Sequence, residues 1–164
     1  MRPFRMADIA CVLREECYLL KLYLDACCYN RPLDAQNQPR IRYESEAILA
    51  LLWRVWFGHY IIMGSDALLF ELRKPLSALM FYSVVRDIVH YDVVVWKRAA
   101  EIRGGTNIKD MDSVHLASAG VGGADIFLTT DDRLMKACAH ISLPYRVLNP
   151  ITFMVEEVLR DDYR

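Results

Sequence analysis

Four acidic residues, spread over most of the chain, are candidates to act together as ligands of a metal ion. They are Asp25, Glu71, Asp112 and Asp131. Carboxylates that are brought close together repel one another unless protons or a cation lie between them. Oxygen ligands of this kind suit Mg²⁺ or Mn²⁺, which keep several water molecules and also bind phosphate oxygens of a substrate. Because such ions lower the pKa of a bound water and stabilise an attacked phosphate, the predicted chemistry is phosphodiester hydrolysis.

Each of these acids also has an ordinary structural explanation. Asp25 and Asp131 are each expected to follow a strand, where an Asp is often a turn residue or a helix cap. Asp112 falls in the first turn of a predicted helix, where a negative charge is favourable. Glu71 could pair with Lys74, three residues later. The metal hypothesis therefore depends on a fold that brings the four carboxylates together.

The elements that must position these acids alternate between strand and helix. Short apolar runs predict strands at residues 20–24, 60–63, 125–128 and 146–148, and a short strand or an apolar helix entry at 91–95. Helical patterns and caps predict helices at about 40–57, 65–72, 75–89, 95–102, 110–119, 132–139 and 149–160. Gly64 is expected to end the second strand, and Ser65 to cap the helix that follows.

This alternation predicts an α/β fold with three layers, in which helices cover both faces of a central, mainly parallel sheet. Ligands of such sheets bind beyond the carboxyl ends of the strands. Asp25 and Asp131 should lie at that edge, and Glu71 and Asp112 lie on helices that could face it. The chain has no GxxxxGK[ST] or GxGxxG motif, which excludes the enzymes that carry these nucleotide-binding loops.

Two further kinds of side chain could contribute to a site. His115 follows Asp112 by three residues and shares its helix face, either as a ligand of a softer metal or, as we favour, as a packed and hydrogen-bonded histidine. Among the five cysteines there is no CxxC pair and no Cys/His cluster with zinc spacing. We therefore expect Cys27 and Cys28, on opposite sides of a strand exit, to be packing residues.

Composition and charge limit the class of protein. The 164 residues are 54% hydrophobic and 25% charged, as in a single globular domain. The formal net charge of -1 means that nucleic-acid binding would need a local basic rim. No apolar run approaches the roughly 18 to 20 residues of a membrane helix, so we expect a cytoplasmic protein without a membrane partner. The aromatic group of Trp53, Trp56 and Phe57 is expected in the core or at a dimer interface.

Four segments together resemble a PIN domain. They are "YLDACCYNRPLD" (23–34), "GSDALLFELRK" (64–74), "DMDSVHLASA" (110–119) and "ADIFLTTDDRL" (124–134). The resemblance runs from about residue 21 to 158 and is greatest to the prokaryotic VapC-type toxin ribonucleases. It implies a parallel sheet between helices and a ribonuclease that depends on Mg²⁺ or Mn²⁺.

The resemblance also implies roles for individual residues. The four acids match the family's metal-binding and catalytic carboxylates: Asp25 at the end of the first strand, Glu71 in the second motif, Asp112 at the opening of the third and Asp131 in the last. Thr129 matches the small hydroxyl residue that steadies such a site. Asp132 is a neighbour without an assigned role.

The sequence therefore predicts two parts, an N-terminal extension (1–18) and a PIN-like nuclease domain (19–164). The expected function is a metal-dependent endoribonuclease, the toxin of a toxin–antitoxin pair, with RNA as substrate, a small antitoxin protein as partner and a homodimer as one possible assembly. The alternative is a non-catalytic PIN-like binding module. Arg31, Arg40 and Arg133 are candidates to contact substrate phosphates.

Overall fold

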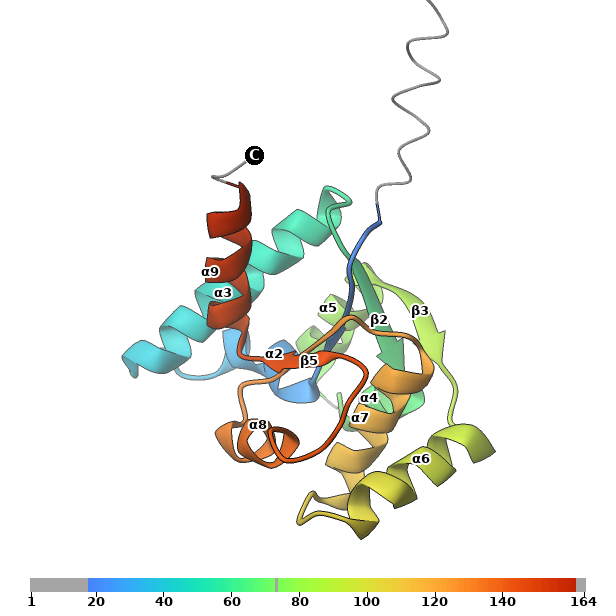
Figure 1. Cartoon of the computed structure of the whole chain (residues 1–164). Coiled ribbons are helices and arrows are strands. Elements are labelled where there is room, and N and C mark those ends of the chain that lie inside the picture. The colour runs from blue at the N-terminus through green and yellow to red at the C-terminus, as the bar shows by residue number, and fades with distance from the viewer. Residues whose placement is uncertain (1–17, 73, 162–164) are drawn as a thin grey trace, which may run out of the picture.

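The computed structural model describes residues 18–72 and 74–161, so nearly all of the predicted N-terminal extension lies outside the described residues (Figure 1). Five parallel strands form one sheet in the order β3-β2-β1-β4-β5. The strands are β1 (Lys21–Leu24), β2 (Ile61–Ser65), β3 (Val85–Val89), β4 (Ile126–Leu128) and β5 (Arg146–Leu148). The predicted α/β class with a parallel sheet is confirmed.

Helices cover both faces of this sheet, which makes the three predicted layers (Figure 1). They are α2 (Ala26–Asn30), the 3-10 turn η1 (Arg31–Leu33), α3 (Pro39–Trp56), α4 (Asp66–Glu71), α5 (Pro75–Val84), α6 (Val93–Gly104), α7 (Asp110–Val121), α8 (Asp132–Cys138) and α9 (Pro150–Asp161). Helix α3 packs against α5 and α9, whereas α6 packs against α7. Within the described part of the chain, no helix has both the length and the apolar character needed to cross a bilayer.

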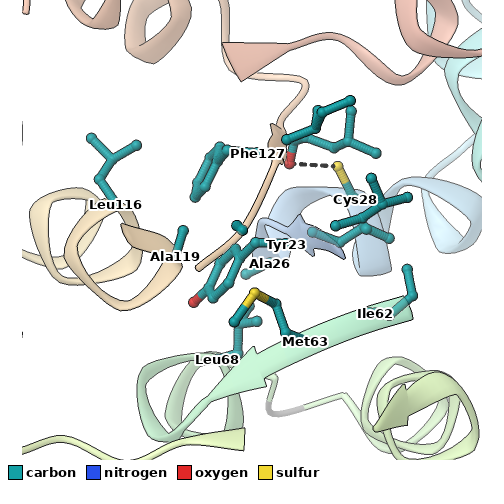
Figure 2. Packing of buried hydrophobic residues seen from close by; sticks show 14 of the residues in the cluster. Tyr23, Ala26, Cys28, Ile62, Met63, Leu68, Leu116, Ala119 and Phe127 are labelled. Atoms are coloured by element: carbon teal, nitrogen blue, oxygen red, sulfur yellow. Dashed lines mark hydrogen bonds between the residues drawn. The ribbon is translucent and has the colours of Figure 1, made fainter. Parts of the chain in front are cut away.

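Strand β1 is central because its sequence is apolar on both sides. Leu22, Tyr23 and Leu24 are completely buried, as expected for a strand covered on both faces and paired along both edges. The ring of Tyr23 stacks on Phe127 of β4 with 5.3 Å between centroids, inside the core shown in Figure 2. This packing fixes the direction of β1, and with it the position of Asp25, which follows the strand at the edge of the sheet.

One predicted helix proves to be a helix followed by a strand. We expected a helix over 75–89, but α5 ends at Val84 and the chain continues as β3, which pairs with β2. Val85, Ile88 and Val89 are β-branched residues, which fit a strand better than a helix interior. The helix prediction failed because pairing with β2 outweighs the weak helical preference of this segment.

Other boundaries also differ from the prediction. Strand β2 does not end at Gly64 but continues through Ser65, because pairing with β3 extends that far. At 91–95 the helix-entry alternative is correct, since the Asp92 carboxylate accepts hydrogen bonds from the backbone N–H groups of Val94 and Val95 at 2.9 Å and caps α6. These changes leave the carboxyl ends of β1 and β4 where the sequence placed them.

The aromatic group at the end of α3 does not belong to the core. Trp53, Trp56 and Phe57 are 67%, 70% and 61% exposed, so the core expectation was wrong for all three. Trp53 and Phe57 contact each other edge to face, with 5.0 Å between ring centroids. The alternative expectation, a dimer interface, stays a prediction.

The close approach of α5 to β2 can be tested at Gly64. A Cβ added there would lie 2.5 Å from two ring carbons of the buried Phe81 and 3.2 Å from a methyl of Val85. We expect Gly64→Ala to lower the free energy of unfolding by about 1–3 kcal/mol, measured by urea denaturation. Gly104→Ala is the control, because an added Cβ there meets no atom within 4 Å. Equal losses in the two variants would contradict this packing.

Candidate metal centre

Asp25 is held rigidly at the seam between β1 and β4. Its backbone N–H donates to the carbonyl of Leu128, the last residue of β4, at 2.9 Å, and Asp25 itself lies one residue beyond the end of β1. One carboxylate oxygen accepts the N–H of Ala26 at 2.7 Å and caps α2, and the other accepts the hydroxyl of Thr129 at 2.8 Å. The cap explanation and the ligand explanation for Asp25 are therefore compatible. The role of Thr129 as a support for this acid agrees with its expected position.

Cys27 was missed as a neighbour of the site. Because α2 begins directly after Asp25, the two cysteines lie on a helix and not on a strand exit. The Cys27 thiol donates to Asp25 Oδ2 at 3.1 Å and lies 3.3 Å from the hydroxyl oxygen of Thr129. Cys28 is buried and donates to the carbonyl of Leu128 at 3.3 Å, the dashed contact in Figure 2. The packing prediction is thus confirmed for the buried Cys28, and Cys27 also packs against the core but in addition contacts Asp25, which the prediction missed.

Glu71 is oriented by His115. Glu71 is the last residue of α4, and its Oε2 lies 2.8 Å from Nε2 of His115, which is 1% exposed within α7. An ionised carboxylate can only accept, so Nε2–H donates to Glu71. His115 is therefore packed and hydrogen-bonded, as we favoured from the sequence.

A chain of buried hydroxyls continues from His115 into the core. With its proton on Nε2, the ring accepts the hydroxyl of Tyr23 at Nδ1 over 2.8 Å. The Tyr23 oxygen then accepts the hydroxyl of Ser65 over 2.7 Å, and the Ser65 oxygen accepts the N–H of Leu68 as the cap of α4. The Ser65 hydroxyl thus caps the helix that carries Glu71. Through Tyr23, it also helps to fix the histidine that donates to the Glu71 carboxylate.

Asp25, Glu71 and His115 form the compact part of the centre. Each offers one ligand atom, and these atoms all lie within 4.8 Å of one another. The two carboxylates suit a divalent ion, and the imidazole could add a nitrogen ligand only if Nε2 lost its proton and its contact with Glu71, because Nδ1 already accepts from Tyr23. Asp25 and His115 are buried, but Glu71 is partly exposed and lines an open cavity of about 300 Å³. These three residues could therefore bind a metal ion that solvent can reach.

Asp112 and Asp131 lie next to this group but outside its compact part. Burial raises the pKa of Asp112, and the negative charges of Asp25 and Asp131 raise it further. Asp131 caps α8, because its carboxylate accepts the backbone N–H groups of Arg133 and Leu134 at 2.8 and 3.2 Å. Two of the four predicted acids, Asp25 and Glu71, are therefore in the compact group, and Asp112 is close enough to Asp25 and Asp131 for their charges to raise its pKa.

Two of the three candidate phosphate contacts are already bound to acids within the protein. The buried Glu44 forms ion pairs with the Nε atoms of both Arg31 and Arg40 at 2.9 Å. Arg40 also donates to Asp132 at 2.7 Å. These arginines stabilise the turn after α2 and the start of α8, and they are not offered to a substrate.

Arg133 is the candidate that remains at the rim. Its side chain is 63% exposed, and its Nη2 lies 4.0 Å from a carboxylate oxygen of Asp112 and 4.0 Å from one of Asp131. Exposed ion pairs of this length are weak and easily exchanged. Arg133 could therefore leave these acids for a phosphate or make room for a cation.

No protein-family model matches the sequence, and no curated protein is significantly similar to it. The relationship to PIN domains thus stays a hypothesis that rests on the four motifs. What supports a function is the geometry at the carboxyl edge of the sheet, where Asp25, Glu71 and His115 come from three separate segments and lie close together.

The electrostatic strain at Asp112 can be tested through stability. Since the folded state raises the pKa of Asp112, ionising it at neutral pH costs folding free energy, and this cost disappears below the unfolded pKa of about 3.9. We expect Asp112→Asn to raise the melting temperature in chelator at neutral pH, with a smaller gain near about pH 4. Asp110→Asn is the control, because Asp110 is 80% exposed and pairs with Arg103 at 2.9 Å. A lower melting temperature of Asp112→Asn than of the parent protein at neutral pH would contradict an unfavourable ionisation of Asp112.

The hydroxyl chain gives a separate prediction about metal affinity. Tyr23→Phe keeps the buried ring but removes the donor to His115 Nδ1, so the histidine is no longer held in the form that orients Glu71. We expect Mn²⁺ to bind about 10- to 100-fold more weakly, measured by titration with electron paramagnetic resonance. Tyr29→Phe is a matched control, since within the described residues the buried Tyr29 hydroxyl has no hydrogen-bond partner. Equal Mn²⁺ affinities in the two variants would show that the chain of hydroxyls does not contribute to metal binding.

Proposed function

We propose that this protein is a metal-dependent endoribonuclease of the PIN type, with Asp25, Glu71, Asp112 and Asp131 as its acidic site. The observation that supports the proposal is the close approach of Asp25 and Glu71 at the carboxyl edge of a parallel sheet, where ligands of such folds bind, with the charges of Asp25 and Asp131 acting on Asp112. The acids come from segments up to about a hundred residues apart in the chain, so local turn or cap chemistry does not account for their meeting.

The charges at this edge favour a divalent cation. Among the described residues, the cations near these carboxylates include the exposed guanidinium of Arg133 and the ammonium of Lys109, and the imidazole of His115 already donates to Glu71. Mg²⁺ or Mn²⁺, when bound, would neutralise this charge, lower the pKa of a water and stabilise the developing charge on a phosphate. The protein's own part is to hold Asp25 with Thr129, to orient Glu71 with His115, and to keep Asp112 and Asp131 within reach.

The substrate class follows from the same arrangement together with the resemblance. A cluster of hard oxygen ligands open to solvent on one side suits a phosphodiester, whose oxygens complete the coordination of the ion. RNA is proposed over DNA because the motifs resemble VapC-type ribonucleases. On the same ground we propose that the protein is the toxin of a toxin–antitoxin pair, with a small antitoxin protein as partner, acts in the cytoplasm and can form a homodimer.

A non-catalytic binding module is the second candidate, and one observation favours it. Arg31 and Arg40 are bound to Glu44, so two of the three predicted phosphate contacts are lost. A rim with few available cations binds nucleic acid weakly unless a metal ion contributes charge. The acids would then hold a structural cation or contact a partner protein.

The decisive measurement is cleavage of a labelled RNA by the full chain with Mg²⁺ or Mn²⁺. We expect Asp25→Asn and Glu71→Gln each to lower the cleavage rate by at least about 100-fold, because each removes a ligand charge, and chelator to abolish cleavage. Glu46→Gln is the control, since Glu46 is 65% exposed on α3 and pairs only weakly, with Arg42 at 3.9 Å.

Other outcomes separate the two candidates. Cleavage that persists in Asp25→Asn or in chelator would contradict the metal-dependent site. Absence of cleavage by the parent protein on varied RNAs, together with metal binding that Asp25→Asn abolishes, would favour the binding module.

A further inference from the structure

An aromatic side chain stands at the mouth of the candidate metal centre. Phe70 precedes Glu71 in α4 and is 62% exposed. Its side chain lines the same open cavity as Glu71, together with Ala26 and Asn30. A ligand that reaches Glu71 through this cavity therefore meets an aromatic surface within it.

Phe70 also forms the wall of a second cavity, of about 280 Å³. This cavity is lined by Asp66, Ala67, Phe70, Tyr91, Met111 and Val114. Its lining is mainly apolar, with the Asp66 carboxylate as the acidic group. That carboxylate is fixed, because it accepts the backbone N–H of Tyr91 at 2.8 Å and lies 3.2 Å from Nδ1 of His90. The two cavities thus share Phe70, with Glu71 on one side and a mainly apolar pocket on the other.

We propose that Phe70 stacks on a base of the RNA next to the cleaved phosphate, and that the cavity between Phe70 and Tyr91 receives this base. The inference rests on the proposed function, since it assigns a subsite of the same site. Single-stranded RNA is recognised chiefly by bases that leave the stack and pack on aromatic side chains. A base and its own phosphate belong to one nucleotide, so a phosphate at the acids brings a base into the range of the adjoining cavity.

The shape and chemistry of this pocket favour a base over an apolar segment of a partner protein. Its aromatic wall is continuous with the acidic cavity, and a ligand with one planar apolar part and one phosphate matches both halves at once. The Asp66 carboxylate at the pocket can accept a hydrogen bond from an amino group of a base, which an aliphatic side chain cannot donate.

The test uses the full chain with Ca²⁺ in place of Mg²⁺, so that a short labelled RNA binds without being cut. Binding is measured by fluorescence anisotropy for the intact RNA and for RNAs with one base removed at successive positions. In the parent protein we expect one abasic position beside the cut to weaken binding by about 5-fold or more. In Phe70→Leu we expect the intact RNA to bind that much more weakly, and the same abasic position to cause no further loss.

The matched control is Phe57→Leu, an exposed phenylalanine of equal accessibility at the end of α3. It is 61% exposed and precedes β2, so it lies toward the opposite edge of the sheet from the acids. Phe57→Leu should bind every RNA as the parent protein does. The Mn²⁺ affinity of Phe70→Leu should also equal that of the parent, which excludes an indirect effect on Glu71.

Three outcomes would overturn the subsite. They are unchanged RNA binding in Phe70→Leu, equal sensitivity to the abasic position in Phe70→Leu and parent, and a parallel loss of Mn²⁺ affinity. In each of these cases RNA cleavage by the parent protein would still support the proposed nuclease. If the parent protein neither cleaves nor binds RNA, the nuclease proposal fails and the subsite fails with it.

Discussion

The hydrogen bond from the Asp25 N–H to the Leu128 carbonyl is the contact on which the candidate site depends. It extends the β1–β4 pairing by one residue and thereby places the side chains that follow the two strands beside each other. Asp25 meets Thr129 at 2.8 Å for this reason, and Asp131 follows two residues later as the cap of α8. A parallel pair of strands ending together is thus sufficient to bring two distant acids to one edge, provided that both strands are buried.

The second constraint is that the acids must not separate despite their repulsion. Three of the four are held by a contact that also serves the fold: Asp25 and Asp131 cap helices, and Glu71 accepts from a histidine buried in α7. Asp112 carries the remaining strain, visible in its raised pKa. An arrangement that costs stability and is nevertheless fixed from several sides is typical of a functional site, because packing alone would have selected neutral residues.

The sequence predicted the parts of this arrangement that follow from local patterns. The apolar runs of β1 and β4 and the acids directly after them could be recognised because buried parallel strands are short, apolar and followed by turn chemistry. The strand β3 could not, since Arg86 and Asp87 interrupt its apolar pattern and only pairing with β2 makes it a strand.

The side chains that support the site were beyond the reach of local patterns. From the sequence, Tyr23 is a strand residue and Ser65 a helix cap. They are 42 residues apart in the chain, and nothing in this spacing indicates that their hydroxyls contact each other. The contact of Cys27 with Asp25 was missed because it depends on where α2 begins. Hydrogen bonds between side chains of separate elements depend on how those elements pack in the folded protein, and local sequence patterns do not indicate this.

The ion pairs around Glu44 reduce the positive charge that this protein, with its net charge of -1, could offer to RNA. Glu44 is buried and must be paired, so Arg31 and Arg40 are bound by it and their positive charge is spent within the fold. Among the described residues at the carboxyl edge, the carboxylates outnumber the nearby cations Arg133 and Lys109, so this surface attracts phosphate poorly. On the proposed function, attraction of the substrate therefore depends on the cation that the acids hold. Binding of RNA and binding of the metal ion would be coupled, and removal of the ion would release the RNA as well as stop its cleavage.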